Sequence, residues 1–201
     1  MTRLSVNLNK VALIRNSRGS NFPDLIQVAK DCERFGAQGI TVHPRPDERH
    51  CKFSDLPLLK ENCATEFNIE GYPDRHFLEA VIKVKPHQCT LVPDAPNQIT
   101  SDHGWDTIAQ KDFLKEIIQE LKSNKIRVSL FIDADAKQIE GAANIGADRI
   151  EYYTGPYAKH FTVHPENAIK AIRETCSVAI KNGLGINAGH DLNLENLTIA
   201  S

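Results

Sequence analysis

The feature that most constrains the fold is an alternation of short, β-branched apolar runs with longer segments of helical periodicity. Seven such runs predict strands, recurring about every 25 to 40 residues, at positions 4–8, 39–42, 66–70, 88–92, 127–133, 149–153 and 184–188. Strands that alternate with helices form parallel sheets through right-handed crossovers. We therefore expect an α/β fold, with a (β/α)8 TIM barrel as the leading candidate and an open, doubly wound sheet as the alternative. No G-x-G-x-x-G follows the first strand and no P-loop occurs, which disfavours the nucleotide-binding forms of the open sheet.

The segments between the strands predict the helices and one long loop. Apolar residues at helical spacing predict helices within 25–36, 54–62, 73–82, 113–121, 135–143 and 165–182, and a further helix begins near 193. Asp135 and Gln138 have the spacing of a capping box. Residues 93–105 form a long polar loop, and loops of this length inside a compact domain often close over a site.

The composition is that of a soluble globular chain. Its 201 residues, 41% hydrophobic and 25% charged, suit a single domain spanning 1–201. A net charge of −2 disfavours a nucleic-acid binder but permits a local phosphate site. Five scattered cysteines without a C-x-x-C pair indicate reduced thiols, and no signal-peptide or membrane-span pattern occurs. We therefore expect a cytoplasmic protein without nucleic-acid or membrane partners.

The stretch 39–50 concentrates groups that can do chemistry. A β-branched strand ends at His43, and two prolines then prevent regular structure from continuing. Arg45, Arg49 and His50 follow within eight residues of the strand end. Imidazoles and guanidiniums in a stiff loop after a parallel strand are typical of the active-site side of an α/β enzyme. The alternative is a surface loop that is merely basic.

Polar residues also stand at or just beyond the other predicted strand ends. They are Asn7, Asn9, Glu70, Thr90, Asp133, Glu151, Gly189 and His190. In a parallel barrel these ends lie on one face, where catalytic groups converge. Two histidines and two glutamates that enter one pocket could supply acid and base roles with separated pKa values.

Each of these residues also has a structural explanation. Glu70 could lie at a helix N-terminus, and Asp133 is better explained as a packing or supporting carboxylate. Glu151 is harder to explain structurally, because an ionised carboxylate in mid-strand needs a cation or a ligand beside it. The histidine spacing matches no metal site, and no G-x-S-x-G motif indicates a serine hydrolase.

Taken together, several separate stretches resemble the pyridoxine 5′-phosphate synthase family from Leu4 to about Leu197. They are residues 5–7, 15–19, 39–43 with Arg45 and 49–50, 67–70, 91–93, 128–135, 146–147, 150–151, 154–155 and 187–190. No single stretch is diagnostic, but their order and spacing together are highly specific.

The resemblance implies a fold and an activity. The family is a (β/α)8 barrel with extra short helices, which forms homo-oligomers built from dimers, up to octamers. It condenses 3-amino-2-oxopropyl phosphate with 1-deoxy-D-xylulose 5-phosphate to give pyridoxine 5′-phosphate, phosphate and water. The family needs no metal and no organic cofactor. Such a condensation depends on general acids and bases more than on a strong nucleophile.

The resemblance also implies roles for individual residues. His43 and Glu70 match proton acceptors, His190 matches a proton donor, and Glu151 matches a carboxylate that stabilises polarised intermediates. The positions that match substrate-binding residues are Asn7 and Arg18 for the aminoketone phosphate, and Asn9, Lys10, Arg45, His50 and Thr100 for the deoxyxylulose phosphate. Thr100 lies in the 93–105 loop, so we expect that loop to close over the substrate.

This sequence departs from the family pattern in three places. Asn9 and Lys10 replace an Asp-His pair, and Lys10 can still meet a phosphate or hydroxyl. Asp191 replaces a glycine and should repel phosphate unless it points away. The family continues beyond position 201 with an eighth strand and a final helix, so we expect a barrel that is incomplete at its C-terminal end.

Two alternative functions remain at this stage. One is a shortened, non-catalytic relative that binds phosphorylated ligands or serves as an assembly subunit. The other is a different barrel lyase or isomerase acting on sugar phosphates, which strand-end carboxylates and arginines alone would permit.

Overall fold

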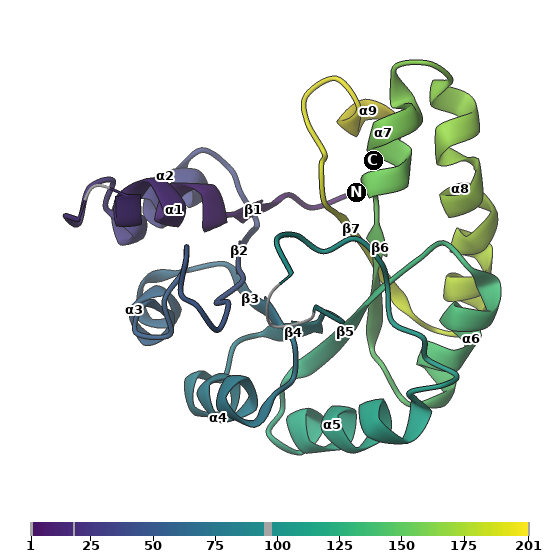
Figure 1. Ribbon diagram of the computed structural model, residues 1–201, viewed down its shortest axis with the longest axis horizontal. Helices are drawn as coiled ribbons and strands as arrows, with labels where there is room; N and C mark the ends of the chain where they lie inside the picture. Colours follow the sequence, from purple (N-terminus) through teal and green to yellow (C-terminus); the bar gives the residue numbers. More distant parts are fainter. Residues whose placement is uncertain (1, 18, 95–97, 201) are drawn as a thin grey trace.

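The fold is a curved, seven-stranded parallel sheet with helices around its outer side (Figure 1). The computed structural model describes residues 2–17, 19–94 and 98–200. The strands pair in chain order, and they are β1 (Ser5–Asn7), β2 (Gly39–Val42), β3 (Glu66–Gly71), β4 (Gln88–Leu91), β5 (Arg127–Ile132), β6 (Arg149–Tyr153) and β7 (Gly185–Gly189). All seven predicted strands are confirmed to within about two residues. Neighbouring pairs such as Ile40 with Phe67 are parallel and in simple register, as expected for a β/α barrel wall.

The helices follow the strands largely as predicted. They are α1 (Asn9–Ser17), α2 (Leu25–Arg34), α3 (Asp55–Asn62), α4 (Arg75–Val84), α5 (Lys111–Ser123), α6 (Ala136–Asn144), α7 (Gly155–Phe161), α8 (Pro165–Lys181) and α9 (Leu197–Ala200). Neither α1 nor α7 was predicted. Asp135 caps α6 by accepting from the backbone N–H groups of Lys137 and Gln138, but Gln138 does not return the bond. The Gln138 side chain accepts from the N–H of Thr107 instead, so only half of the predicted capping box forms.

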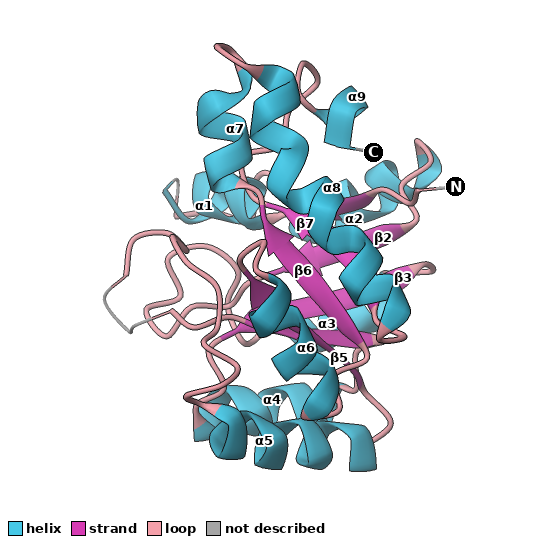
Figure 2. Cartoon of the chain, turned by 90° about the vertical axis from the view of Figure 1, so that its right-hand side faces the viewer, coloured by secondary structure: helices cyan, strands magenta, loops and turns pink. Residues whose placement is uncertain are grey.

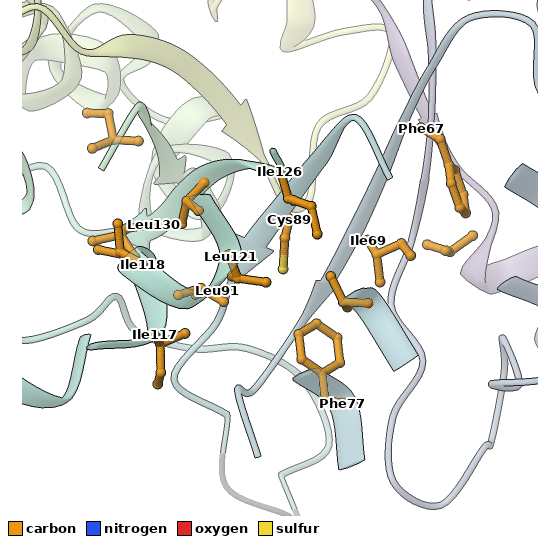
Figure 3. Close-up of a cluster of buried hydrophobic side chains, with 14 of the residues drawn as sticks. Phe67, Ile69, Phe77, Cys89, Leu91, Ile117, Ile118, Leu121, Ile126 and Leu130 are labelled. Carbon is orange, nitrogen blue, oxygen red and sulfur yellow. The ribbon is translucent and has the colours of Figure 1, made fainter. Parts of the chain in front are cut away.

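The hydrophobic core lies between the outer face of the sheet and the helices. Alternate residues of each strand point outward, and Ile69, Leu91 and Leu130 are fully buried. Figure 3 shows these side chains packing toward Phe77 of α4 and Ile117, Ile118 and Leu121 of α5. Burial of this apolar surface supplies most of the driving force for folding.

The inner face of the sheet is polar instead. The other alternate residues join a chain of hydrogen bonds, running from Ser5 through Thr41 and Asn68 to Gln88 and Thr90. This alternation follows from the two-residue period of a strand, which sends successive side chains to opposite faces. The polar face is therefore available to a site, while the apolar face holds the structure together.

The sheet is open along one side. Within the described residues β1 and β7 each pair with only one neighbour, so the arrangement is an incomplete (β/α)8 barrel. Figure 2 shows the long loops gathered on one side of the sheet, which positions them over the strand ends. No helix in the described part of the chain is both long and apolar enough to cross a membrane.

Candidate active site

The end of β2 places two basic side chains in a buried environment. His43 is 6% exposed and Arg45 is 5% exposed, and both approach the carboxylate of Asp94 beyond β4. Arg45 Nη2 donates to Asp94 Oδ2 at 2.6 Å, and His43 Nε2 lies 3.9 Å from the same oxygen. His43 and Arg45 therefore form a buried group with the carboxylate of Asp94, while Arg49 and His50 of the predicted cluster are only partly buried.

The loop that carries His50 is held from α1. Asn16 Nδ2 donates to the carbonyl oxygens of Glu48, Arg49 and His50, the last at 2.7 Å. Arg15, itself buried, forms a two-pronged ion pair with Asp55 at 2.8 Å in both branches. Two-pronged guanidinium–carboxylate pairs fix orientation as well as position. The unpredicted helix α1 thus braces the loop that shapes one side of the site.

Histidine protonation at the end of β2 follows from these surroundings. Burial, reinforced by the charge of Arg45, holds the pKa of His43 well below its ordinary value. Burial and Arg45 also lower the pKa of His50, whose Nδ1 donates to the His43 carbonyl at 3.1 Å. Both imidazoles are therefore neutral near pH 7, and a neutral imidazole can accept a proton.

Two carboxyl groups meet inside the sheet with raised pKa values. Burial raises the pKa of Glu151 to about 7. Burial, followed by the charges of Glu151 and Asp94, raises the pKa of Glu70 well above its ordinary value. Asn68 Nδ2 donates to Glu70 at 3.3 Å and Thr90 Oγ1 to Glu151 at 3.4 Å, so neutral groups are their close partners. A carboxyl pair in this state can hold a proton near neutral pH and pass it on.

Space beside Glu151 depends on Gly189 at the end of β7. A Cβ atom at position 189 would lie 2.5 Å from Glu151 Oε1, which is closer than real atoms approach. Gly185 makes similar room for Arg149 at the opposite end of the strand. The glycines of β7 therefore allow long side chains of β6 to lie across the inner face.

The long loop reaches the far side of the site. Thr100 Oγ1 lies 2.9 Å from His190 Nε2, and His190 Nδ1 donates to Asp191 at 2.8 Å. The ring of His190 also stands edge-on to Tyr153 at 5.2 Å. Asp191 is thus directed toward its neighbouring histidine, and the contact from Thr100 places part of the 93–105 loop across the strand ends.

Most predicted site residues lie at this carboxyl-terminal end of the sheet. Asn7 accepts from the N–H of Asn9, and Asn9 accepts from the N–H of His43, both at 2.9 Å, which links β1 to β2. Lys10 is exposed on the first turn of α1. Arg18 lies outside the described residues.

Sequence reasoning missed Asp94 and the inner-face residues Asn68 and Gln88. The alternation Asn68-Ile69-Glu70 was a usable signal, because it places Asn68 on the same face as Glu70. Asp94 carried no such signal, since it belongs to an irregular segment. Among the described residues no group of three or more His, Cys, Asp or Glu side chains could hold a metal ion.

The fold and the site together define an incomplete (β/α)8 barrel with carboxyl groups and neutral histidines gathered at the carboxyl ends of its strands. Comparison with family models then gives a direct match over residues 4–201. The chain belongs to the family described as "Pyridoxal phosphate biosynthesis protein PdxJ".

Curated relatives agree with this assignment. The chain is 59% identical over 197 residues to the pyridoxine 5′-phosphate synthase of Cytophaga hutchinsonii, covering 98% of this chain and 83% of that protein. The synthases of Christiangramia forsetii and Bacteroides thetaiotaomicron are each 55% identical over the same shares.

Solved structures with low sequence identity share the fold. The flavin-binding domain of baker's yeast flavocytochrome b2 has a TM-score of 0.61 at 14% identity, covering 92% of this chain and 52% of that one. The HMG-CoA lyase of Brucella melitensis has a TM-score of 0.56 at 11% identity, covering 92% and 80%. At such identities the likeness concerns the fold alone.

Proposed function

We propose that the protein is a pyridoxine 5′-phosphate synthase. It would condense 3-amino-2-oxopropyl phosphate with 1-deoxy-D-xylulose 5-phosphate to give pyridoxine 5′-phosphate, phosphate and water in vitamin B6 biosynthesis. The observation that carries this proposal is membership of the family over residues 4–201, together with relatives of that name at 52–59% identity. The paired carboxyl groups and neutral histidines suit the chemistry that the reaction requires.

The reaction needs protons to leave and return several times. Condensation of an amine with a ketone expels water, which requires an acid at the departing oxygen and a base at the nitrogen. In our proposal His43 and Glu70 accept protons, His190 donates one, and Glu151 stabilises cationic intermediates. A carboxyl with a pKa of about 7 is divided between its two forms near neutral pH, so Glu151 responds readily to charge that develops beside it.

Different residues would hold the two phosphorylated substrates. Arg45, His50 and Thr100 are proposed to hold the deoxyxylulose phosphate, with Asn9 and Lys10 contributing beside them. Asn7 and Arg18 are proposed to hold the aminoketone phosphate. Arginine suits phosphate esters because its planar guanidinium can donate two parallel hydrogen bonds.

Assembly and location extend the same proposal. We expect a dimer-based homo-oligomer, up to an octamer, acting in the cytoplasm without nucleic-acid or membrane partners. Light scattering on the purified chain would measure the oligomeric state directly, and a monomer at assay concentration would contradict this part.

The decisive experiment incubates the purified chain with both phosphorylated substrates and follows pyridoxine 5′-phosphate and inorganic phosphate together. The two products should appear in equal amounts. Omission of either substrate should abolish both products. Binding of both substrates without product would contradict the proposal and would instead indicate a protein that only binds phosphorylated ligands.

A further inference from the structure

Asp94 is a buried carboxylate outside the residues to which the proposed reaction gives a role. It follows Pro93 after β4, and only 4% of its surface is exposed. Its Oδ2 atom accepts from Arg45 Nη2 at 2.6 Å and from Ser101 Oγ at 2.9 Å. His43 Nε2 lies 3.9 Å from that oxygen, so the end of β2 and the 93–105 loop meet at one atom.

The ion pair between Arg45 and Asp94 is deeply buried, so its disruption would cost considerable free energy. A guanidinium removed from water needs a negative partner, and loss of that partner leaves an uncompensated charge in the interior. Arg45 Nη1 donates to the carbonyl of Gln98 at 3.0 Å, so two acceptors at different angles fix the plane of the guanidinium. A phosphate arriving at Arg45 would therefore meet a cation whose orientation is already set.

Asp94 also connects that cation to the long loop. Ser101 shares Oδ2 with Arg45, and Arg49 Nη2 donates to the same Gln98 carbonyl at 3.1 Å. Gln98 thus binds the guanidinium of Arg45 directly and Ser101 binds its partner Asp94, while Thr100 between them contacts His190. Asp94 consequently contributes both to the orientation of Arg45 and to the position of the loop.

The other carboxylate oxygen of Asp94, Oδ1, adds nothing among the described residues that would hold the side chain in place. Asp94 Oδ1 is buried and has no hydrogen-bond partner within the described part of the chain. The carboxylate is therefore held through Oδ2 alone, and its position depends on the same two donors that it orients. An asparagine would keep the shape and could keep one acceptor, but it would remove the charge.

We propose that Asp94 is a positioning residue for the sugar-phosphate side of the site, acting through Arg45 and through the loop contact of Ser101. The inference rests on the proposed function, in which Arg45 holds the phosphate of 1-deoxy-D-xylulose 5-phosphate. A role as a competing anion, displaced by that phosphate, is disfavoured because displacement would leave Asp94 buried and unpaired.

The test compares D94N and D94E with wild type in the full chain. The matched control is D102N, which removes an exposed carboxylate from the same loop. D94N should raise KM for 1-deoxy-D-xylulose 5-phosphate at least about tenfold, as expected for loss of a charge-assisted hydrogen bond, and should leave KM for the aminoketone within about twofold. D94E keeps the charge and should raise the first KM less than D94N does. D102N should match wild type.

Calorimetric binding of 1-deoxy-D-xylulose 5-phosphate alone separates this inference from the proposed function. If wild type binds it but makes no pyridoxine 5′-phosphate, the proposed function fails, and weaker binding by D94N still supports positioning. If wild type makes product and D94N shows unchanged values, or raises both KM values equally with a lowered melting temperature, positioning is overturned while the function stands. If wild type does not bind the sugar phosphate at all, both are overturned.

Discussion

The two ends of the sheet's inner face differ in how their charged side chains are paired. At the amino end Glu66 pairs with Arg127 at 2.5 Å, and Arg127 Nε donates to Gln88 at 3.0 Å. Arg149 Nε also finds a partner there, the amide oxygen of Asn187 at 2.9 Å. At the carboxyl end the charge of Glu151 acts on Glu70, and in the described part of the chain both carboxyl groups have only neutral side chains as hydrogen-bond partners.

The difference separates stability from chemistry along the same strands. The Glu66–Arg127 pair at the amino end is about a third exposed, so it acts as an ordinary ion pair. The carboxyls at the other end are held in a costly state that shifts their pKa values toward neutrality, where proton transfer works best. Barrel enzymes in general use the carboxyl end for catalysis and the amino end for stability.

The largest expected effect is a loss of kcat when a carboxyl group at the carboxyl end of the sheet is replaced. E70Q should lower kcat by about 100- to 10,000-fold, because a positioned acid or base contributes that much and glutamine cannot transfer the proton. Steady-state assays of pyridoxine 5′-phosphate formation measure it. E66Q is the matched control, since Glu66 lies on the same strand and face at the opposite end, and kcat should change less than about threefold. Equal losses in the two variants would refute the division of roles.

An intermediate effect concerns the pH dependence of folding. The pKa of Glu151 is raised from its ordinary value of 4.5 to about 7, so the folded state binds this proton more tightly than the unfolded state. Stability contributed by the protonated group is complete below pH 4.5 and is lost as the pH rises through about 7. The free energy of unfolding of wild type should therefore fall relative to E151Q across that window and then level off.

Urea denaturation of both proteins at several pH values checks this difference. The lowered pKa values of His43 and His50 act with the opposite sign, but they are present in both proteins and largely cancel. A difference that is constant or rises with pH would show that Glu151 is ionised without penalty in the folded state.

The smallest expected effect is a loss of stability when the ion pair at the amino end of the sheet is removed. R127M should lower the free energy of unfolding by about 1–2 kcal/mol, because it removes a partly screened ion pair and one hydrogen bond. Urea titration measures this loss, which should shrink at high salt. kcat/KM should stay within about twofold of wild type. A large catalytic loss at unchanged stability would mean that the amino end takes part in the reaction.

Sequence patterns predicted the strands well because each strand is a short apolar run that stands between segments of helical periodicity. Helix α1 escaped prediction for a physical reason: its buried positions are Ala12 and Arg15, whereas Leu13 and Ile14 are 42% and 55% exposed. Because the large apolar residues of this helix are exposed and a charged residue is buried, its sequence lacks the apolar stripe that predicts a helix packed on a core. Helix α7 has only seven residues, too few for a period to show.

The candidate site divides along the same line. His43, Glu70, Glu151 and His190 could be chosen from sequence because strand ends are identifiable and converge in a parallel barrel. Asp94 could not, because its importance lies in meeting Arg45 across a sequence separation of 49 residues. A contact between residues far apart in the sequence, one of them in an irregular segment, produces no repeating pattern that sequence analysis could detect.

Gly189 imposes a joint restriction on two distant positions. Its backbone φ lies outside the left-handed region, so the local conformation would accept other residues. The close atom is Glu151 Oε1, the end of a flexible side chain, which lies 2.5 Å from the place of a Cβ atom. A heavier residue at 189 would therefore displace the end of the Glu151 side chain from its position beside Thr90. The absence of a side chain at Gly189 thus sets where the Glu151 carboxyl group can lie, and a substitution at 189 should alter the position of that carboxyl group more than the fold.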